Sequence, residues 1–131
     1  MVENLGLVFV GGGLGAVCRY FVTMQIGARF GTFFPWGTLT VNTVGSFMMG
    51  FIMGMLLLLI ERMGTSVSEP VRLLLTVGFL GGLTTFSSFS METLTLLRGG
   101  SYFYAICNIS SNIILGLLAA GCGVFLAARL S

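Results

Sequence analysis

The chain has 131 residues, of which 56% are apolar and only 8% are charged, whereas a soluble domain usually carries about 25% charged residues. The charged residues are six arginines and four glutamates, and the sequence contains no Asp, Lys or His. So few charges cannot cover the surface of a water-soluble globule, and the mean hydropathy is +1.04. We therefore expect an integral membrane protein. The net charge of +2 is too small to indicate a nucleic-acid-binding surface.

The missing residue types also exclude most catalytic chemistry. Without His or Asp there is no Ser-His-Asp triad, no histidine general base and no histidine metal site, so we do not expect an enzyme. Three cysteines, Cys18, Cys107 and Cys122, lie in apolar runs and form no C-x-x-C pair. We expect them to be small buried hydrophobic residues. The start Met-Val-Glu-Asn lacks the basic residues of a cleaved signal peptide, so the first apolar segment is expected to remain as a membrane helix.

Long charge-free runs set the expected fold. A membrane-spanning helix needs about 20 mostly apolar residues, and the runs predict four spans at about 4–27, 36–60, 71–97 and 101–128. We therefore expect an all-α integral membrane protein. The four spans use most of the chain, so residues 1–131 are expected to form a single membrane domain.

The connections between these spans have local causes. Pro35-Trp36 places a proline where a helix begins and an indole where the membrane interface lies. Ser68 or Glu69 is expected to cap a helix whose first turn contains Pro70. Residues 98–101, Arg-Gly-Gly-Ser, predict a tight turn between the last two spans.

The arginines give almost no preference for one orientation in the membrane. The side that holds both termini and the 61–70 connection carries Arg62, Arg72 and Arg129, and the opposite side carries Arg29 and Arg98, with Arg19 if its side chain reaches that interface. Two interpretations stay open. Either one weakly favoured orientation is adopted, or the chain inserts both ways and pairs with an inverted copy.

Small and polar residues recur every four positions in the second and fourth spans. The two stripes are Asn42, Ser46, Gly50 and Gly54, and Asn108, Asn112, Gly116 and Ala120. Small residues let membrane helices pack closely, which accounts for the glycine ends. The asparagines favour a functional role as well, because an amide in lipid has several hydrogen-bonding groups to satisfy.

The first span contains Gly11-Gly12-Gly13-Leu14-Gly15-Ala16, which matches the G-x-G-x-x-A pattern of dinucleotide-binding loops. No acidic residue lies between Glu3 and Glu61, so the partner for a ribose is missing. Close packing against another helix explains these glycines better.

The third span carries an unusual polar tract in its middle. Gly81-Gly82 weakens a helix there, and unwound backbone at that depth is tolerated only where protein or a water-filled cavity satisfies it. In such broken helices the freed carbonyls often bind a cation. The hydroxyls of Thr84 and Thr85 are oxygen ligands of the kind that hard cations prefer.

Two aromatic residues follow this tract, Phe86 and Phe89, interleaved with Ser87, Ser88 and Ser90. The edge of an aromatic ring is positive, so ring edges together with hydroxyl donors would suit a small anion. A pair of core phenylalanines is the simpler alternative, but it does not account for the serines.

Arg19 and Glu92 are the two charges that look embedded in the membrane, away from the ends of the expected spans, and intramembrane charges indicate functional sites. Arg19 either extends to the interface or lies in a wide vestibule, where it would raise the local anion concentration. Glu92 either accepts hydrogen bonds from serines or pairs with an arginine.

Three motifs in order resemble one family. Residues 78–92, GFLGGLTTFSSFSME, closely resemble the G-x-x-G-G-L-T-T-F-S-(T/S)-F-S-x-E signature of the Fluc (CrcB) fluoride channels. Residues 36–42, WGTLTVN, resemble the second-span signature of that family, and residues 12–20, GGLGAVCRY, resemble its first-span pattern. The resemblance covers essentially the whole chain.

The resemblance implies a passive fluoride-selective channel in a prokaryotic plasma membrane, which exports fluoride and protects the cell from it. It implies four-span subunits that pair as an antiparallel, dual-topology homodimer, with the third helix broken at its centre. It further implies a structural Na⁺ on the dimer axis, bound by backbone carbonyls of Gly81 and Thr84 from both subunits.

The resemblance also implies roles for individual side chains. Arg19 would lie in the vestibule and Glu92 near the exit of a polar track. The residues implied for the fluoride pathway are Phe86, Phe89, Asn42, Thr38, Ser87, Ser88, Ser90 and Asn112.

Two other functions fit the length and the four spans. A small dual-topology, proton-coupled multidrug transporter needs an acid deep in the first span, where this chain has Arg19, so Glu92 would have to serve instead. A structural membrane subunit with no transport role would leave the Ser, Thr and Phe tract unexplained.

Overall fold

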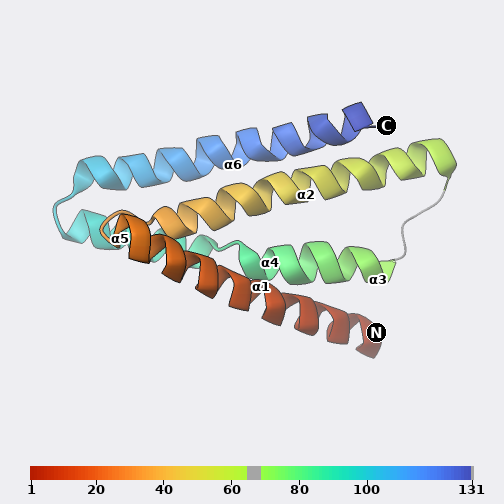
Figure 1. Cartoon of the computed structure of the whole chain (residues 1–131), viewed down its shortest axis with the longest axis horizontal. Helices are drawn as coiled ribbons and strands as arrows, with labels where there is room; N and C mark the ends of the chain where they lie inside the picture. The colour runs from red at the N-terminus through yellow and green to blue at the C-terminus, as the bar shows by residue number, and fades with distance from the viewer. Residues whose placement is uncertain (65–68, 131) are drawn as a thin grey trace.

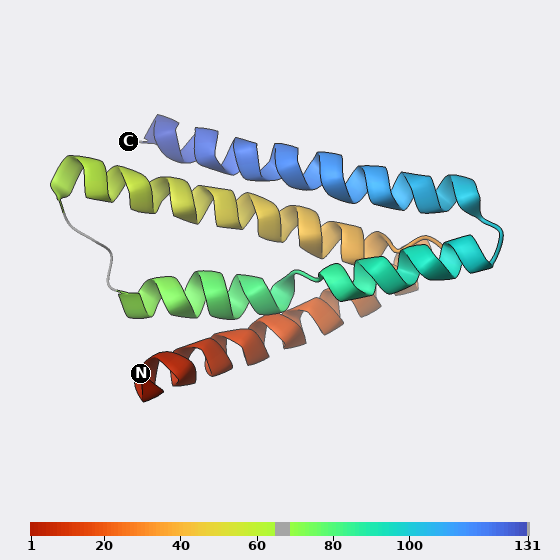
Figure 2. The same ribbon diagram turned by 180° about the vertical axis from the view of Figure 1, so that it is seen from behind.

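The computed structural model describes residues 1–64 and 69–130, and that part of the chain is helical apart from short connections (Figures 1 and 2). The elements in chain order are α1 (Val2–Phe30), α2 (Trp36–Met63), α3 (Glu69–Arg72), the π-helix η1 (Leu73–Leu80), α4 (Gly81–Leu83), α5 (Phe86–Arg98) and α6 (Tyr102–Leu130).

Four helical segments are long and apolar enough to cross a membrane: Val2–Phe30, Trp36–Arg62, Glu69–Arg98 and Tyr102–Leu130. The four expected spans lie within them, except that Ser101 falls one residue outside, so the prediction of four such helices is confirmed. Both termini lie at one end of the bundle, and the α1–α2 and α5–α6 connections lie at the other, here called the turn end (Figure 1).

The α5–α6 connection is the tight turn that the sequence predicts. Gly100 has φ +76°, a left-handed conformation that favours glycine. The Ser101 N–H donates to the Leu96 carbonyl at 2.9 Å, which closes the end of α5. At the α1–α2 connection, the ring of Phe34 packs against Trp36, with centroids 4.6 Å apart, and the edge of Phe33 meets Tyr104 at 5.0 Å. These ring contacts pack together the connections at the turn end.

Helices α2 and α6 run parallel and pack through the two predicted stripes. Each member of the α2 stripe lies beside a residue 70 positions later on α6, as shown by the contacts of Asn42 with Asn112, Ser46 with Gly116, Gly50 with Ala120 and Gly54 with Val124. A side chain at Gly50 would meet the Ala120 carbonyl, because the two backbones approach so closely. The prediction of close packing by the glycines is confirmed.

Helix α1 packs against the third segment through its own glycines. A Cβ atom at Gly15 would meet the Phe79 carbonyl and lie 2.8 Å from the Leu83 nitrogen, and one at Gly82 would meet the Gly12 carbonyl. The helix-packing interpretation of the first-span glycines is therefore confirmed, and these residues do not form a phosphate-binding loop.

The third segment departs from a regular α-helix in two ways. After α3 it continues as a π-helix over Leu73–Leu80 that the sequence does not predict. Gly81 and Gly82 are helical, and the extended residues are the two that follow Leu83, namely Thr84 (φ −81°, ψ 156°) and Thr85 (φ −151°, ψ 121°). Threonine is stiff at χ1 and suits extended backbone, so the irregular backbone lies after the glycine pair rather than at it.

Two expectations of detail have different outcomes. Cys18 and Cys122 are exposed and Cys107 is half-buried, so the expectation of buried cysteines is wrong for the first two. The reason is that the outward faces of membrane helices are as apolar as the inward ones, and an apolar run does not identify the buried face.

Pro70 lies in the first turn of α3 as expected, whereas a cap at Ser68 lies outside the described residues.

The α1 packing predicts a position-specific effect of side-chain size. Gly15→Val is expected to lower the thermal midpoint of the purified protein in detergent and to cost about 1–3 kcal/mol, because the new side chain overlaps the backbone of η1 and α4. Gly13→Val is the matched control on the same helix, since nothing lies within 4 Å of a Cβ atom there. Equal midpoints for the two variants would contradict this packing.

Candidate functional site

The amide of Asn42 on α2 binds the extended backbone between α4 and α5 at two points. The Thr85 N–H donates to Asn42 Oδ1 at 2.8 Å, and Asn42 Nδ2 donates to the Thr85 carbonyl at 3.1 Å. Extended residues lose their helical hydrogen bonds, and unsatisfied backbone groups are costly in a membrane. The Asn42 side chain satisfies both groups of Thr85.

Thr85 in turn begins α5. Its Oγ1 accepts from the Ser88 N–H at 3.2 Å, the usual geometry of an N-cap threonine. Thr85 Oγ1 also lies 3.2 Å from Ser88 Oγ and 3.4 Å from Ser87 Oγ. Ser90 Oγ donates to the Phe86 carbonyl at 2.9 Å. The three serines of the tract are therefore hydrogen-bonded to the first turn of α5.

These bonds redirect two backbone donors. In a continuous helix the Thr85 N–H would bind the Gly81 carbonyl, and the Ser88 N–H would bind the Thr84 carbonyl. Here they bind Asn42 Oδ1 and Thr85 Oγ1 instead. The carbonyls of Gly81 and Thr84 thus lose the donors that a helix would give them. Arg19 Nη1 donates to the Thr84 carbonyl at 3.4 Å, a long hydrogen bond.

A chain of side-chain amides extends from Asn42 into α6 and α5. Asn42 Nδ2 donates to Asn112 Oδ1 at 2.9 Å. Asn112 Nδ2 donates to the backbone carbonyl of Asn108 and to Asn108 Oδ1, each at 3.0 Å. Asn108 Nδ2 donates to Thr93 Oγ1 at 2.9 Å, and Thr93 Oγ1 donates to the Phe89 carbonyl at 2.8 Å. The chain therefore begins at Asn42 and ends at the backbone of Phe89.

A cavity of about 420 Å³, here called the central cavity, lies beside this network. Its walls combine amides, hydroxyls and aromatic rings, and it is lined by Asn42, Gly45, Ser46, Met49, Thr84, Thr85, Phe86, Phe89, Asn112, Ile113 and Ala120. The rings of Phe86 and Phe89 are tilted by 52° with centroids 5.6 Å apart. Phe86 is 78% exposed, so it is not a core residue of the single chain.

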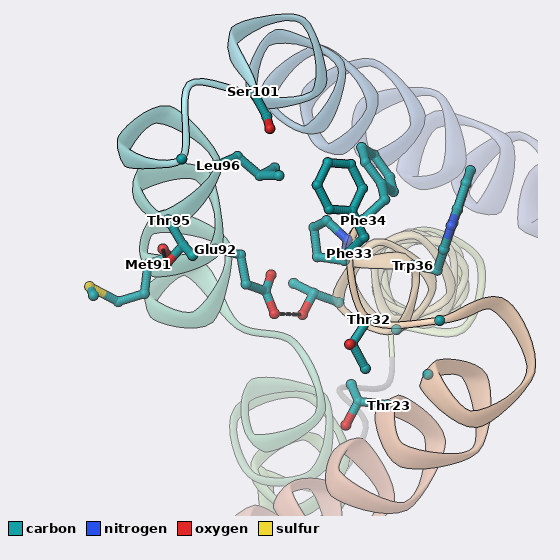
Figure 3. A pocket seen from close by; sticks show the side chains of 16 residues that line it. Thr23, Thr32, Phe33, Phe34, Trp36, Met91, Glu92, Thr95, Leu96 and Ser101 are labelled. Carbon is teal, nitrogen blue, oxygen red and sulfur yellow. Dashed lines mark hydrogen bonds between the residues drawn. The ribbon is translucent and has the colours of Figure 1, made fainter.

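A second cavity of about 560 Å³, the end cavity, opens at the turn end (Figure 3). Thr38, which is only 3% exposed, donates to Glu92 Oε1 at 2.7 Å. Figure 3 shows the Glu92 side chain reaching from α5 toward this partner, with Phe33, Phe34 and Trp36 on the far wall. Glu92 Oε2 is buried and has no hydrogen-bond partner among the described residues.

The site residues predicted from the sequence therefore fall into separate groups. The central cavity brings together Asn42, Phe86, Phe89 and Asn112. Thr38 and Glu92 line the end cavity instead. Arg19 contacts the Thr84 carbonyl, and Ser87, Ser88 and Ser90 are not among the residues that line either cavity. Among the described residues, Glu92 Oε1 accepts a hydrogen bond from the Thr38 hydroxyl, a partner that neither alternative for Glu92 named.

Sequence reasoning missed two participants. Thr85 appears there only as a candidate cation ligand, yet it is the residue that Asn42 binds. Thr93 does not appear at all, although it receives the hydrogen bond of Asn108. Its spacing of four residues from Phe89 is the available signal, because a helical threonine hydroxyl often binds the carbonyl four residues earlier.

Comparison with known proteins places the chain in a family. The family described as "CrcB-like protein, Camphor Resistance (CrcB)" matches residues 6–124. A protein named "Fluoride-specific ion channel FluC" from Citrifermentans bemidjiense is 39% identical over 129 residues, which is 98% of this chain and 100% of the relative. Proteins with the same name from Sphingopyxis alaskensis and Pyrococcus furiosus are 46% and 40% identical, each over 98% of both chains. The chain thus belongs to the CrcB family, as its three motifs predict.

Proposed function

We propose that this protein is a passive, fluoride-selective ion channel that spans a prokaryotic cell membrane several times and exports fluoride from the cytoplasm. The observation that carries the proposal is the near-complete alignment with relatives that are named fluoride-specific channels. Four helices long and apolar enough to cross a membrane agree with it. The role is transport rather than catalysis.

The chemistry of the central cavity supports an anion as the transported ion. Fluoride is small and strongly hydrated, so a narrow pore must replace its water with donors and still bind it weakly enough for release. The amide N–H groups of Asn42 and the edges of Phe86 and Phe89 supply such contacts without a fixed charge. In the structure both N–H groups of Asn42 are engaged, with Thr85 and Asn112. A fluoride ion would take the place of the Asn112 oxygen.

The competing functions receive less support. A proton-coupled drug transporter needs an acid that alternately binds a proton and a cationic substrate. The first span has none in its interior, since Glu3 lies in its first turn, and Glu92 is held by Thr38 at the turn end. The three relatives named above are channels by name. A structural subunit with no transport role would not require a cavity that combines two amides with two aromatic rings.

We propose that the four spans form one membrane domain and that two copies associate as an antiparallel, dual-topology homodimer. The balance of arginines between the two membrane sides supports insertion in both orientations. The exposure of Phe86 beside the central cavity supports a partner that covers this face, because a ring edge in open lipid would recognise no ion.

The third span is proposed to be a broken helix that carries a sodium site on the dimer axis. The carbonyls of Gly81 and Thr84 fit such an ion, because their helical donors are redirected to Asn42 and Thr85 and oxygen atoms are the ligands that hard cations prefer. The Thr84 carbonyl also accepts the long hydrogen bond from Arg19, and its second lone pair would serve the ion. Gly81 is exposed, so its backbone is accessible to a second subunit. A bound Na⁺ would supply positive charge at the centre of an anion channel and link the two chains.

The function is tested by fluoride efflux from liposomes that contain the purified protein. We expect fluoride to leave rapidly and chloride to be retained. Phe86→Ile is expected to slow fluoride efflux at least tenfold, because it removes one ring edge from the central cavity. Phe9→Ile is the matched control, since Phe9 is 82% exposed on α1 and lines neither cavity.

Chloride efflux as fast as fluoride efflux would reject a fluoride-selective channel. Equal slowing by the two phenylalanine variants, with intact protein on gel filtration, would reject the role of Phe86.

Dual topology predicts that one position is reached from both sides of the membrane. Cys18, Cys107 and Cys122 are first replaced by alanine, and a single cysteine is introduced at exposed Thr32. A membrane-impermeant thiol reagent is expected to label about half of the protein in intact cells and the rest after permeabilisation, because near-equal arginine counts leave neither orientation dominant. Complete labelling, or none, before permeabilisation would show a single orientation.

The sodium site predicts ion-specific stabilisation. The thermal midpoint of the protein in detergent is expected to be higher in Na⁺ than in choline at equal ionic strength, because an ion that binds only the folded dimer stabilises it by mass action. At a concentration 100 times the dissociation constant the gain is about 2.7 kcal/mol. Identical midpoints in the two salts, down to Na⁺-free buffer, would count against a sodium site at these carbonyls.

A further inference from the structure

Three side chains outside the central cavity's aromatic wall connect Asn42 to Phe89. Asn112 binds Asn42, Asn108 binds Asn112, and Thr93 binds Asn108 and the Phe89 carbonyl. Two of these linking residues, Asn108 and Thr93, do not line the central cavity. Asn108 is 0% exposed, which makes it one of the few fully buried side chains in the described part of the chain.

The order of donors and acceptors in this series of hydrogen bonds fixes the orientation of each amide. The Thr93 hydroxyl has one hydrogen, and it donates this hydrogen to the Phe89 carbonyl. Thr93 therefore accepts from Asn108, which must present its nitrogen to Thr93 and its oxygen to Asn112. Asn112 must then present its nitrogen to Asn108 and its oxygen to Asn42. Reversing any one amide would place two donors or two acceptors against each other.

We propose that Thr93 and Asn108 are positioning residues for the ion pathway. They hold the Asn112 amide with its oxygen toward Asn42 and thereby keep Asn42 on the Thr85 backbone. The inference rests on the proposed function for its effect on transport, but the amide orientation itself is a property of the fold.

The buried position of Asn108 makes this arrangement sensitive to the loss of one hydroxyl. Without Thr93 Oγ1, a donor of Asn108 is buried without a partner, and such a group is costly. The amide of Asn108 then rotates toward another acceptor. Asn112 keeps the backbone carbonyl of Asn108 but loses Asn108 Oδ1, one of the two oxygens that hold its nitrogen. The residues that line the central cavity stay the same, but the amides of Asn112 and Asn42 are no longer held in a fixed orientation.

Thr93→Val removes the hydroxyl with little change in volume, and Thr93→Ser keeps it. We expect Thr93→Val to slow fluoride efflux roughly three- to tenfold, the effect of losing one net hydrogen bond. The rate of fluoride efflux through Thr93→Ser should stay within about twofold of the wild-type rate, because the hydroxyl is kept. Thr76→Val is the matched control, because Thr76 is also buried and its hydroxyl donates to the Arg72 carbonyl four residues earlier, away from the central cavity.

A second measurement does not depend on transport. In nitrogen-15 NMR spectra of the protein in detergent, the side-chain amide signals of Asn42 and Asn112 are expected to move in Thr93→Val. They should remain in place in Thr93→Ser and in Thr76→Val. If Thr93→Val fails to fold, Asn108→Leu serves instead, since it keeps the volume and removes the amide, and it is expected to move the same signals.

The outcomes separate the two proposals. Wild-type protein that passes no fluoride, with amide signals that move in Thr93→Val alone, rejects the channel and retains the positioning network. Unchanged amide signals in Thr93→Val overturn the network whatever the flux. Equal loss of efflux in Thr93→Val and Thr93→Ser also overturns it, because the hydroxyl would then not be the group that matters.

Discussion

The two-point contact between the Asn42 amide and the Thr85 backbone is the interaction on which the rest of the site depends. Extended residues in the third span leave an N–H and a carbonyl without helical partners, at a place where neighbouring protein must satisfy them. A primary amide offers one acceptor and two donors, so Asn42 satisfies both backbone groups and retains a donor for Asn112. A hydroxyl at position 42 has a single hydrogen and could not donate to both Thr85 and Asn112.

This contact has consequences for both ions of the proposed channel. Because the Thr85 N–H binds Asn42, the Gly81 carbonyl loses its helical donor. Because Thr85 caps α5 by accepting the Ser88 N–H, the Thr84 carbonyl loses the Ser88 N–H as its helical donor. The same residues thus prepare oxygen atoms for a proposed cation and, on the other side, direct an amide into the cavity lined by Phe86 and Phe89. The proposed cation and anion sites would thus be coupled through one short piece of backbone.

Much of this was predictable from the sequence, for identifiable reasons. Periodicity of four residues predicts which faces of α2 and α6 meet, since small residues are the ones that bring membrane helices together, and the pairing of Gly50 with Ala120 confirms it. Which asparagine binds which partner depends on the register between α2 and α6, and a sequence pattern does not specify register. The π-helix at Leu73–Leu80 has no composition signal either, because its residues are ordinary apolar helix formers. For the same reason the role of Thr93, which depends on Asn108 lying opposite it, becomes visible only in three dimensions.

The distribution of charge is consistent with an anion pathway built from neutral groups. Conduction requires binding that is weak or divided among several sites, and neutral amides and ring edges are suited to hold an anion in that way. Arg19 lies near the middle of its span, and it contacts the Thr84 carbonyl rather than lining the central cavity. Glu92 lies at the turn end with one oxygen held by Thr38, and it lines the end cavity rather than the central cavity. Among the residues that the structure describes, none of the charged ones lines the central cavity. In the proposed channel, selectivity would therefore come from the geometry of neutral donors, and the network from Asn42 to Thr93 is proposed to fix that geometry.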